Sequence, residues 1–340
     1  MSVKVSVCIP VYGVEKYIER CARSLFEQTM REDIEFVFVN DCTPDRSIEI
    51  LEQILSEYPH RKEQTKIIHH EQNKGLVAAR KTGLAYASGE YIIHCDSDDW
   101  VELDMYEKMY NAAKENDADM VYCDYFENIS SGKQKIITIP QYNCCDTLLK
   151  NILSGKVHCS LGNKLFKKDI VLADDIYAPD DICLSEDFLR VSQMLLKCKK
   201  VAWYSESFYH YFRERENSYT FPAAYKIEYF NGTCQIVDFL KGILPLHQQR
   251  NLANFQALSM FKAIKHKLLT TEDFKNLWPA DRRRILFAPN LHIIKRLVIL
   301  SAFVSYPLTT EIIMQIQKSC FCNILLKIRN SLKLLYYRRK

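Results

Sequence analysis

Two glycine-rich phosphate-binding motifs are absent from this chain of 340 residues. No G-x-G-x-x-G follows its first apolar segment, which disfavours a dinucleotide-binding fold of the usual kind. The chain also lacks G-x-x-x-x-G-K-S/T, so the aspartate that ends a later apolar segment does not belong to a P-loop site. Its 13 cysteines include no paired C-x-x-C motifs, which disfavours a structural zinc site.

Long apolar runs are absent as well. The stretch Leu297–Val304 is too short to span a bilayer and directly follows Lys295 and Arg296. Polar and charged residues begin at Ser2 and Lys4, and the first apolar run has only the length of a strand. We therefore expect no secretory signal, reduced thiols and a cytoplasmic location.

Positive charge is concentrated at the carboxyl end. Residues 291–340 carry a formal charge of +8, whereas the whole chain carries +4, so the preceding residues sum to −4. Within 321–340, aliphatic and aromatic residues recur at helical spacing among lysines and arginines. Such a helix can lie on an anionic membrane surface, or it can pack on its own domain or on a second subunit, giving a homo-oligomer. Nucleic acid is not expected as a partner, because no recognition motif accompanies the basic residues.

Strand and helix patterns alternate through the first hundred residues. Apolar segments at 3–10, 34–39, 66–70 and 91–95 alternate with helical patterns at 14–29, 46–58 and 75–87. The alternation predicts an α/β fold with a doubly wound sheet, in which ligands bind outside the carboxyl ends of the strands. Turn-forming or acidic residues follow three of the strands, at 10–12, 40–41 and 96–99. We expect these three segments to line one crevice.

Three carboxylates stand within four residues where the fourth of these strands ends. Asp96, Asp98 and Asp99 would repel one another unless a cation lies between them, and hard oxygen ligands favour Mg²⁺ or Mn²⁺. Such ions usually keep part of their coordination sphere for phosphate. Two alternatives remain: a solvated turn in which Asp98 or Asp99 caps a helix over 103–113, and a phosphatase that uses Asp96 as its nucleophile.

Four segments resemble the successive signatures of the family 2 glycosyltransferases, namely Val5–Tyr12, Val39–Asp45, Asn73–Arg80 and Gly89–Trp100. The resemblance implies the GT-A fold, a Rossmann-like mixed sheet. It also implies transfer of a sugar from a nucleotide-diphosphate donor with inversion at the anomeric carbon. We accordingly expect a catalytic domain at 1–220, with a donor-binding part at 1–100 and an acceptor side at 101–220. A helical appendage with a basic amphipathic tail is expected at 221–340.

The resemblance implies a nucleoside pocket at the end of the first strand. Pro10, Val11 and Tyr12 would line the base pocket, with Tyr12 against the base, and Glu15 would lie near the ribose. Asp41 would accept a hydrogen bond from the base imide, which favours uracil and hence a UDP-sugar.

The resemblance also implies how the donor diphosphate is held. Gly75 and Arg80 would face it, because free N–H groups at a helix start and a guanidinium both favour anions. A surface position is the alternative for Arg80. Asp96 and Ser97 would contact the ribose or the donor sugar, and Asp98 would ligate Mn²⁺ or Mg²⁺.

A second acidic pair resembles the family's acceptor signature. Asp187 would be the base that deprotonates the acceptor, and Glu186 would position that acceptor. Both could instead be first-turn carboxylates that complement a helix dipole. The segment 161–167 is expected to shape the acceptor pocket. Arg215 and Ser218 are expected diphosphate contacts, although Arg215 could equally pair with a neighbouring glutamate.

These residues together predict a metal-dependent, inverting glycosyltransferase. We expect it to use a UDP-sugar and to act on a saccharide or lipid-linked saccharide of a surface polysaccharide, peripherally at the inner face of the membrane. One alternative is a sugar-phosphate nucleotidyltransferase, although the basic, glycine-rich triphosphate loop of such enzymes is absent after Pro10. Another is a non-catalytic sugar-nucleotide-binding protein.

Overall fold

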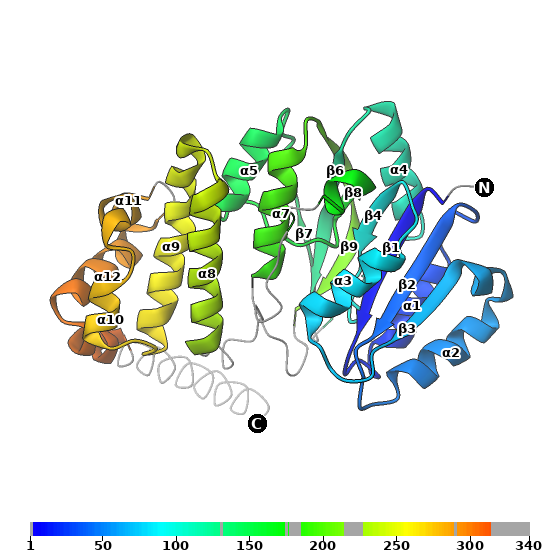
Figure 1. Ribbon diagram of the computed structural model, residues 1–340, viewed down its shortest axis with the longest axis horizontal. Coiled ribbons are helices and arrows are strands. Elements are labelled where there is room, and N and C mark those ends of the chain that lie inside the picture. The colour runs from blue at the N-terminus through cyan, green and yellow to red at the C-terminus, as the bar shows by residue number, and fades with distance from the viewer. Residues whose placement is uncertain are drawn as a thin grey trace, which may run out of the picture. The chain divides into compact units, whose positions relative to one another are not determined.

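The computed structural model describes residues 3–129, 132–173, 176, 185–213, 227–288 and 291–313. The chain divides into two compact units (Figure 1). The first contains residues 1–225 and 231–244, and the second contains residues 226–230 and 245–340.

The first unit is built on a mixed sheet with the strand order β3-β2-β1-β4-β8-β6-β9-β5, to which β7 adds by pairing with β6. The strands are β1 (Val5–Val11), β2 (Ile34–Asn40), β3 (Thr65–His69), β4 (Tyr91–His94), β5 (Trp100–Val101), β6 (Met120–Asn128), β7 (Gln134–Ile137), β8 (Lys164–Lys167) and β9 (Val201–Phe212). Strands β1 to β4 pair in parallel, and so do β6 and β9. The remaining pairs are antiparallel. The expected α/β class with a mixed sheet is confirmed.

Helices cover both faces of the parallel strands because successive residues of a strand point to opposite faces. The helices of this unit include α1 (Ile18–Phe26), α2 (Ser47–Glu57), α3 (Leu76–Tyr86), α4 (Met105–Glu115), α5 (Cys145–Leu153), α6 (Lys168–Val171) and α7 (Glu186–Lys197), with a 3-10 helix η1 (Pro59–Gln64). Ala79 of α3 packs with Val37 and Val39 of β2. Phe36 and Phe38 of the same strand belong to the larger cluster that includes α1.

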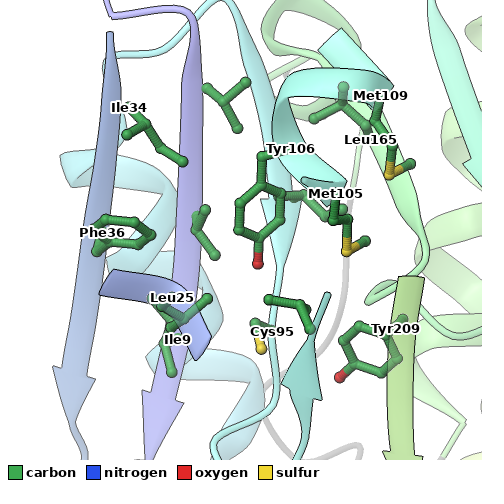
Figure 2. Close-up of a cluster of buried hydrophobic side chains, with 14 of the residues drawn as sticks. Ile9, Leu25, Ile34, Phe36, Cys95, Met105, Tyr106, Met109, Leu165 and Tyr209 are labelled. Atoms are coloured by element: carbon green, nitrogen blue, oxygen red, sulfur yellow. The ribbon is translucent and has the colours of Figure 1, made fainter. Parts of the chain in front are cut away.

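That larger cluster is the main hydrophobic core. It joins alternate residues of β1 and β2 to the inner faces of α1 and α4 and reaches β9. Figure 2 shows Ile9, Phe36, Tyr106 and Tyr209 among the side chains that fill it. Strand β1 is buried along its whole length, as expected for a strand that is covered on both faces. The core thus fixes the positions at which β1, β2 and β4 end.

The described residues from 227 onward are mainly helical, as expected for the carboxyl-terminal part. They form α8 (Ile227–Ile243), α9 (Leu246–Lys265), α10 (Thr271–Asn276), a 3-10 helix η3 (Pro279–Asp281), α11 (Arg282–Leu286) and α12 (Ile293–Val304). Helix α9 packs with α11 and α12 in the second unit. Within the described ranges, no helix has the length and apolar character needed to cross a membrane. The expected tail helix at 321–340 lies outside the described residues.

Candidate active site

Asp41, directly after β2, organises the turn before α3. Its carboxylate accepts hydrogen bonds from the backbone N–H groups of Lys74 and Gly75, at 2.8 Å each, and its Oδ1 lies 2.7 Å from Nδ1 of His70. Gly75 precedes α3 with a φ of +86°, a conformation that favours glycine. Asp41 therefore holds the amino end of α3 in place. Its hydrogen bond to a base stays a prediction.

The loop after β1 is held by hydroxyl and carboxylate groups that the sequence interpretation did not use. The backbone N–H of Gly13 donates to Thr43 at 2.9 Å, and that of Glu15 donates to Asp45 at 2.9 Å. Burial alone would raise the pKa of Asp45, but hydrogen bonds from Ser47, Thr43 and the backbone outweigh it and lower the pKa. The loop is thus braced while the Tyr12 side chain stays exposed.

A buried arginine joins the carboxylates of the two halves of the site. Arg80 of α3 is 3% exposed, so the alternative interpretation that it lies on the protein surface is wrong. Its Nη2 lies 2.7 Å from Oδ1 of Asp96. Its Nη1 pairs with both Glu186 and Asp187 at the start of α7. One guanidinium therefore connects the segment after β4 with the predicted catalytic base.

The pKa values of the two acids at the start of α7, which share the guanidinium of Arg80, shift in opposite directions. Burial raises the pKa of Glu186 to about 7 even though Arg80 opposes the shift. For Asp187, burial would also raise the pKa, but the charge of Arg80, together with hydrogen bonds involving Glu186 and Arg80 and the charge of His158, outweighs burial and the pKa is lowered. The side chain of Asp187 is 24% exposed, whereas that of Glu186 is buried. Asp187 is thus an ionised, accessible carboxylate that can accept a proton.

Asp99 binds β9 instead of capping a helix. Its Oδ1 accepts from the backbone N–H of Phe212 at 2.7 Å, and its Oδ2 accepts from the hydroxyl of Tyr209 at 2.5 Å. The same hydroxyl accepts from the backbone N–H of Asp96 at 3.2 Å. The expectation that Asp98 or Asp99 caps the next helix is wrong, because α4 begins at Met105 with Asp104 as its N-terminal cap residue.

The three aspartates after β4 therefore do not share one ion. Asp96 is paired with Arg80 and Asp99 is hydrogen-bonded to β9, while burial and the charges of Asp98 and Asp96 raise the pKa of Asp99. No cluster of three potential His, Cys, Asp or Glu ligands occurs in the described part of the chain. A magnesium-type ion needs only one or two protein carboxylates when phosphate oxygens and water complete its sphere. The backbone carbonyl of Asp98 accepts from Arg20 at 3.0 Å, and the role of its carboxylate as a metal ligand stays a prediction.

The remaining predicted donor contacts are Ser97, Arg215 and Ser218. Ser97 is buried, so its contact with a donor stays a prediction. Arg215 and Ser218 lie outside the described residues. Tyr209 and the Thr43–Ser47 loop were missed, because the partners that they contact are distant in the sequence.

Comparison with known proteins relates the amino-terminal half of the chain to a defined family. The profile described as "Glycosyl transferase family 2" matches residues 6–173. The uncharacterized glycosyltransferase EpsJ of Bacillus subtilis is 32% identical over 225 residues, which cover 64% of this chain and 62% of that protein. The poly(ribitol-phosphate) beta-glucosyltransferase of Bacillus spizizenii is 32% identical over 239 residues, which cover 68% of this chain and 36% of that protein. The chain thus spans less than two thirds of the length of these relatives.

Solved structures share the fold. Staphylococcus aureus TarS 1-349, in complex with UDP-GlcNAc, has a TM-score of 0.68 and 20% identity, covering 93% of this chain and 92% of that one. The mannosyltransferase PcManGT from Pyrobaculum calidifontis, in complex with GDP-Man and Mn²⁺, has a TM-score of 0.54 and 14% identity, covering 92% and 87%.

Proposed function

Because this chain belongs to the family 2 glycosyltransferases, we propose that it transfers a sugar from a nucleotide-diphosphate donor to a saccharide or lipid-linked saccharide, with inversion. The observation that carries the proposal is the ion pairing of Arg80 with Asp96 on one side and with Asp187 on the other. A partly exposed carboxylate that is kept ionised suits proton abstraction from an acceptor hydroxyl.

In the proposed step, the acceptor oxygen forms a bond to the anomeric carbon while the bond from that carbon to the diphosphate breaks. The hydroxyl proton passes to Asp187, and the electron pair of the broken bond leaves with the diphosphate. Arg80 keeps Asp187 charged before attack, and Glu186, with its raised pKa, limits the negative charge beside it. Inversion follows because attack and departure occur on opposite faces of the donor sugar.

The donor is proposed to be a UDP-sugar that lies over Tyr12 and the braced loop after β1. Support comes from the exposed Tyr12 ring, which can stack on a base, and from the UDP-GlcNAc complex of the structural neighbour TarS. Pro10, Val11, Glu15 and Asp41 are proposed to lie around the nucleoside. The amino end of α3 at Gly75 would favour the diphosphate.

A divalent cation is proposed to accompany the donor. Asp98 would hold it together with diphosphate oxygens, and PcManGT provides an example of the same fold with Mn²⁺. When bound, the ion would neutralise charge on the leaving diphosphate.

A contact with an anionic membrane surface is proposed for the second unit. Ile293, Leu297, Leu300 and Val304 follow one another along one side of α12, and all are exposed. We call these four side chains the α12 stripe. Residues 291–340 have a net charge of +8, so a second copy of the chain bound at this stripe would bring two basic segments together, and they would repel each other. Anionic headgroups complement both features. This location suits a lipid-linked acceptor at the inner face of the membrane in surface polysaccharide synthesis.

The proposal is tested by incubating the purified chain with a panel of UDP-sugars and measuring release of UDP and consumption of intact donor. Asp187→Asn should reduce transfer by about 10²- to 10⁴-fold, the range typical of a lost general base, while UDP still raises the melting temperature. A wild-type chain that consumes no nucleotide sugar would contradict the proposal. Release of pyrophosphate from UTP and a sugar phosphate would instead identify a nucleotidyltransferase.

A further inference from the structure

Three aromatic side chains meet beside the site without a role in the proposed donor chemistry. The ring centroid of His158 lies 6.1 Å from that of Tyr125 on β6 and 6.1 Å from that of Tyr211 on β9, in tilted arrangements. In the parallel pairing of β6 with β9, Tyr125 is opposite Tyr209, and Glu127 is opposite Tyr211. Residues two apart on a strand share a face, so Tyr125, Tyr209 and Tyr211 lie on the same face of the sheet.

The segment that carries His158 lies against Tyr209 of β9. A Cβ at Gly162 would stand 2.2 Å from Cζ of Tyr209, so this approach requires glycine. The hydroxyl of Tyr209 in turn binds Asp99 and the backbone of Asp96. The aromatic group and the residues after β4 are thus connected through one tyrosine, which Figure 2 shows on its strand.

A buried lysine fixes this segment. The Nζ of Lys164 donates to the carbonyl oxygens of His158 at 3.0 Å and Ser160 at 2.7 Å, and to Oδ1 of Asn163 at 2.8 Å. Asn163 itself donates to the carbonyl of Cys123 on β6 at 2.7 Å. All three ammonium protons are used inside the protein. The lysine therefore supports the position of His158 and does not offer a charge to a ligand.

His158 is exposed although other protein groups surround it. Burial by these groups, followed by the charge of Lys164, lowers its pKa, and the carboxylate of Asp187 opposes that shift. The ring is thus within electrostatic reach of Asp187. Its Nδ1 accepts from the backbone N–H of Ser160 at 3.2 Å, so Nε2 carries the proton. Among the described residues, that Nε2–H has no hydrogen-bond partner.

We propose that Tyr125, His158 and Tyr211 hold the pyranose ring of the acceptor, with its reacting hydroxyl directed to Asp187; this inference rests on the proposed function. A pyranose presents C–H groups to aromatic faces and hydroxyls to polar edges, here the Nε2–H and the tyrosine hydroxyls.

The charges around this subsite select a neutral sugar. The acids Glu186 and Asp187 already share the guanidinium of Arg80, and Arg213 is already paired with Glu127 at 3.0 Å. A uronic acid or a phosphorylated sugar would be repelled by these carboxylates, and none of the residues named here offers it an unpaired cation. The predicted acceptor unit is therefore an uncharged hexopyranose or N-acetylhexosamine.

The test uses the full chain, the UDP-sugar that it consumes, and octyl glucoside, octyl galactoside, octyl N-acetylglucosaminide and octyl glucuronide as acceptor probes. At least one neutral glycoside should accelerate UDP release and form a new glycoside, and the glucuronide should be at least tenfold less effective in kcat/KM. His158→Ala and Tyr125→Leu should raise the acceptor KM at least tenfold, with the donor KM and the UDP-induced rise in Tm unchanged. The exposed His60→Ala serves as the matched control.

Each result decides between the two proposals. If the wild-type chain consumes no UDP-sugar, the proposed function falls, and this inference falls with it. If it hydrolyses a UDP-sugar but no neutral glycoside accelerates UDP release, the subsite alone is overturned. Preference for the glucuronide, or acceptor KM values of both variants within twofold of wild type, would also overturn the subsite while leaving the transferase assignment intact.

Discussion

Arg80 and Asp187 are directly paired although 107 positions separate them in the sequence. The same guanidinium binds Asp96 and Glu186, so α3, the segment after β4 and the start of α7 meet at one buried cation. Burial would lower the pKa of Arg80, but the three carboxylates outweigh it and raise the pKa, so the residue stays charged. The proposed donor side and the proposed base are thus coupled electrostatically.

Arg80→Gln is expected to destabilise the chain by about 3–5 kcal/mol, because removal of one partner leaves buried carboxylates uncompensated. Urea unfolding measures this change, with the exposed neighbour Lys81→Gln as the control. Adding Glu186→Gln to Arg80→Gln should recover part of the loss, since one buried charge is then removed. A loss below about 1 kcal/mol for Arg80→Gln would show that the cation does not compensate these acids.

The stability of the chain should depend on Glu186 between about pH 4.5 and pH 7. Burial raises its pKa from 4.5 to about 7, so the folded state binds this proton more strongly than the unfolded state does. The Glu186 contribution to the free energy of unfolding is therefore most favourable below pH 4.5 and is lost as the pH rises through 7. The free energy of unfolding of Glu186→Gln minus that of wild type should therefore be larger at pH 8 than at pH 5.

Urea unfolding of both proteins at pH 5, 6, 7 and 8 measures this difference. Asp187, whose pKa is lowered, changes protonation below this window and does not contribute to it. A difference between the two proteins that is constant over the four pH values would contradict the raised pKa of Glu186.

Local sequence pattern predicted the parallel half of the sheet because each of its strands is a short apolar run with a polar end. β1 and β2 are buried almost throughout, and a short continuous apolar run is typical of a parallel strand that is covered on both faces. The resemblance to the family signatures then led to the prediction that Asp187 is the base. Its pairing with Arg80 could not be predicted, since it requires α7 to approach α3 in three dimensions.

The insertion of β8 between β4 and β6 was not predictable for another reason. Lys164–Lys167 is four residues long and has lysine at both ends, which is typical of a surface turn. Lys164 is nevertheless buried, because three oxygen acceptors surround its ammonium group. These acceptors lie one to six positions away in the sequence, but their placement around the ammonium group depends on how the loop before β8 folds. The pattern of the sequence alone therefore gave no sign of this strand.

The proposed metal dependence leads to a prediction about Asp98. UDP with Mn²⁺ should raise the Tm of the wild-type chain more than UDP with EDTA, because the ion links the diphosphate to the folded state. In Asp98→Asn this metal-dependent part of the shift should disappear, while the metal-independent part remains. Asp104→Asn, an exchange at an aspartate six positions away, is the control. Equal Mn²⁺ effects in wild type and Asp98→Asn would exclude Asp98 as the ligand.

The α12 stripe gives a prediction about membranes. Wild-type chain should co-sediment with vesicles that contain phosphatidylglycerol more strongly than with pure phosphatidylcholine, and added salt should weaken the association. The combined Leu297→Gln, Leu300→Gln and Val304→Gln exchange should weaken binding at least tenfold, because these side chains would enter the apolar layer. Leu246→Gln, at a residue 79% exposed in the same unit, should leave binding unchanged. Binding of the triple variant equal to wild type would exclude the stripe as the contact, and a switch of wild type from dimer to monomer in the triple variant would identify a second copy of the chain as its occupant.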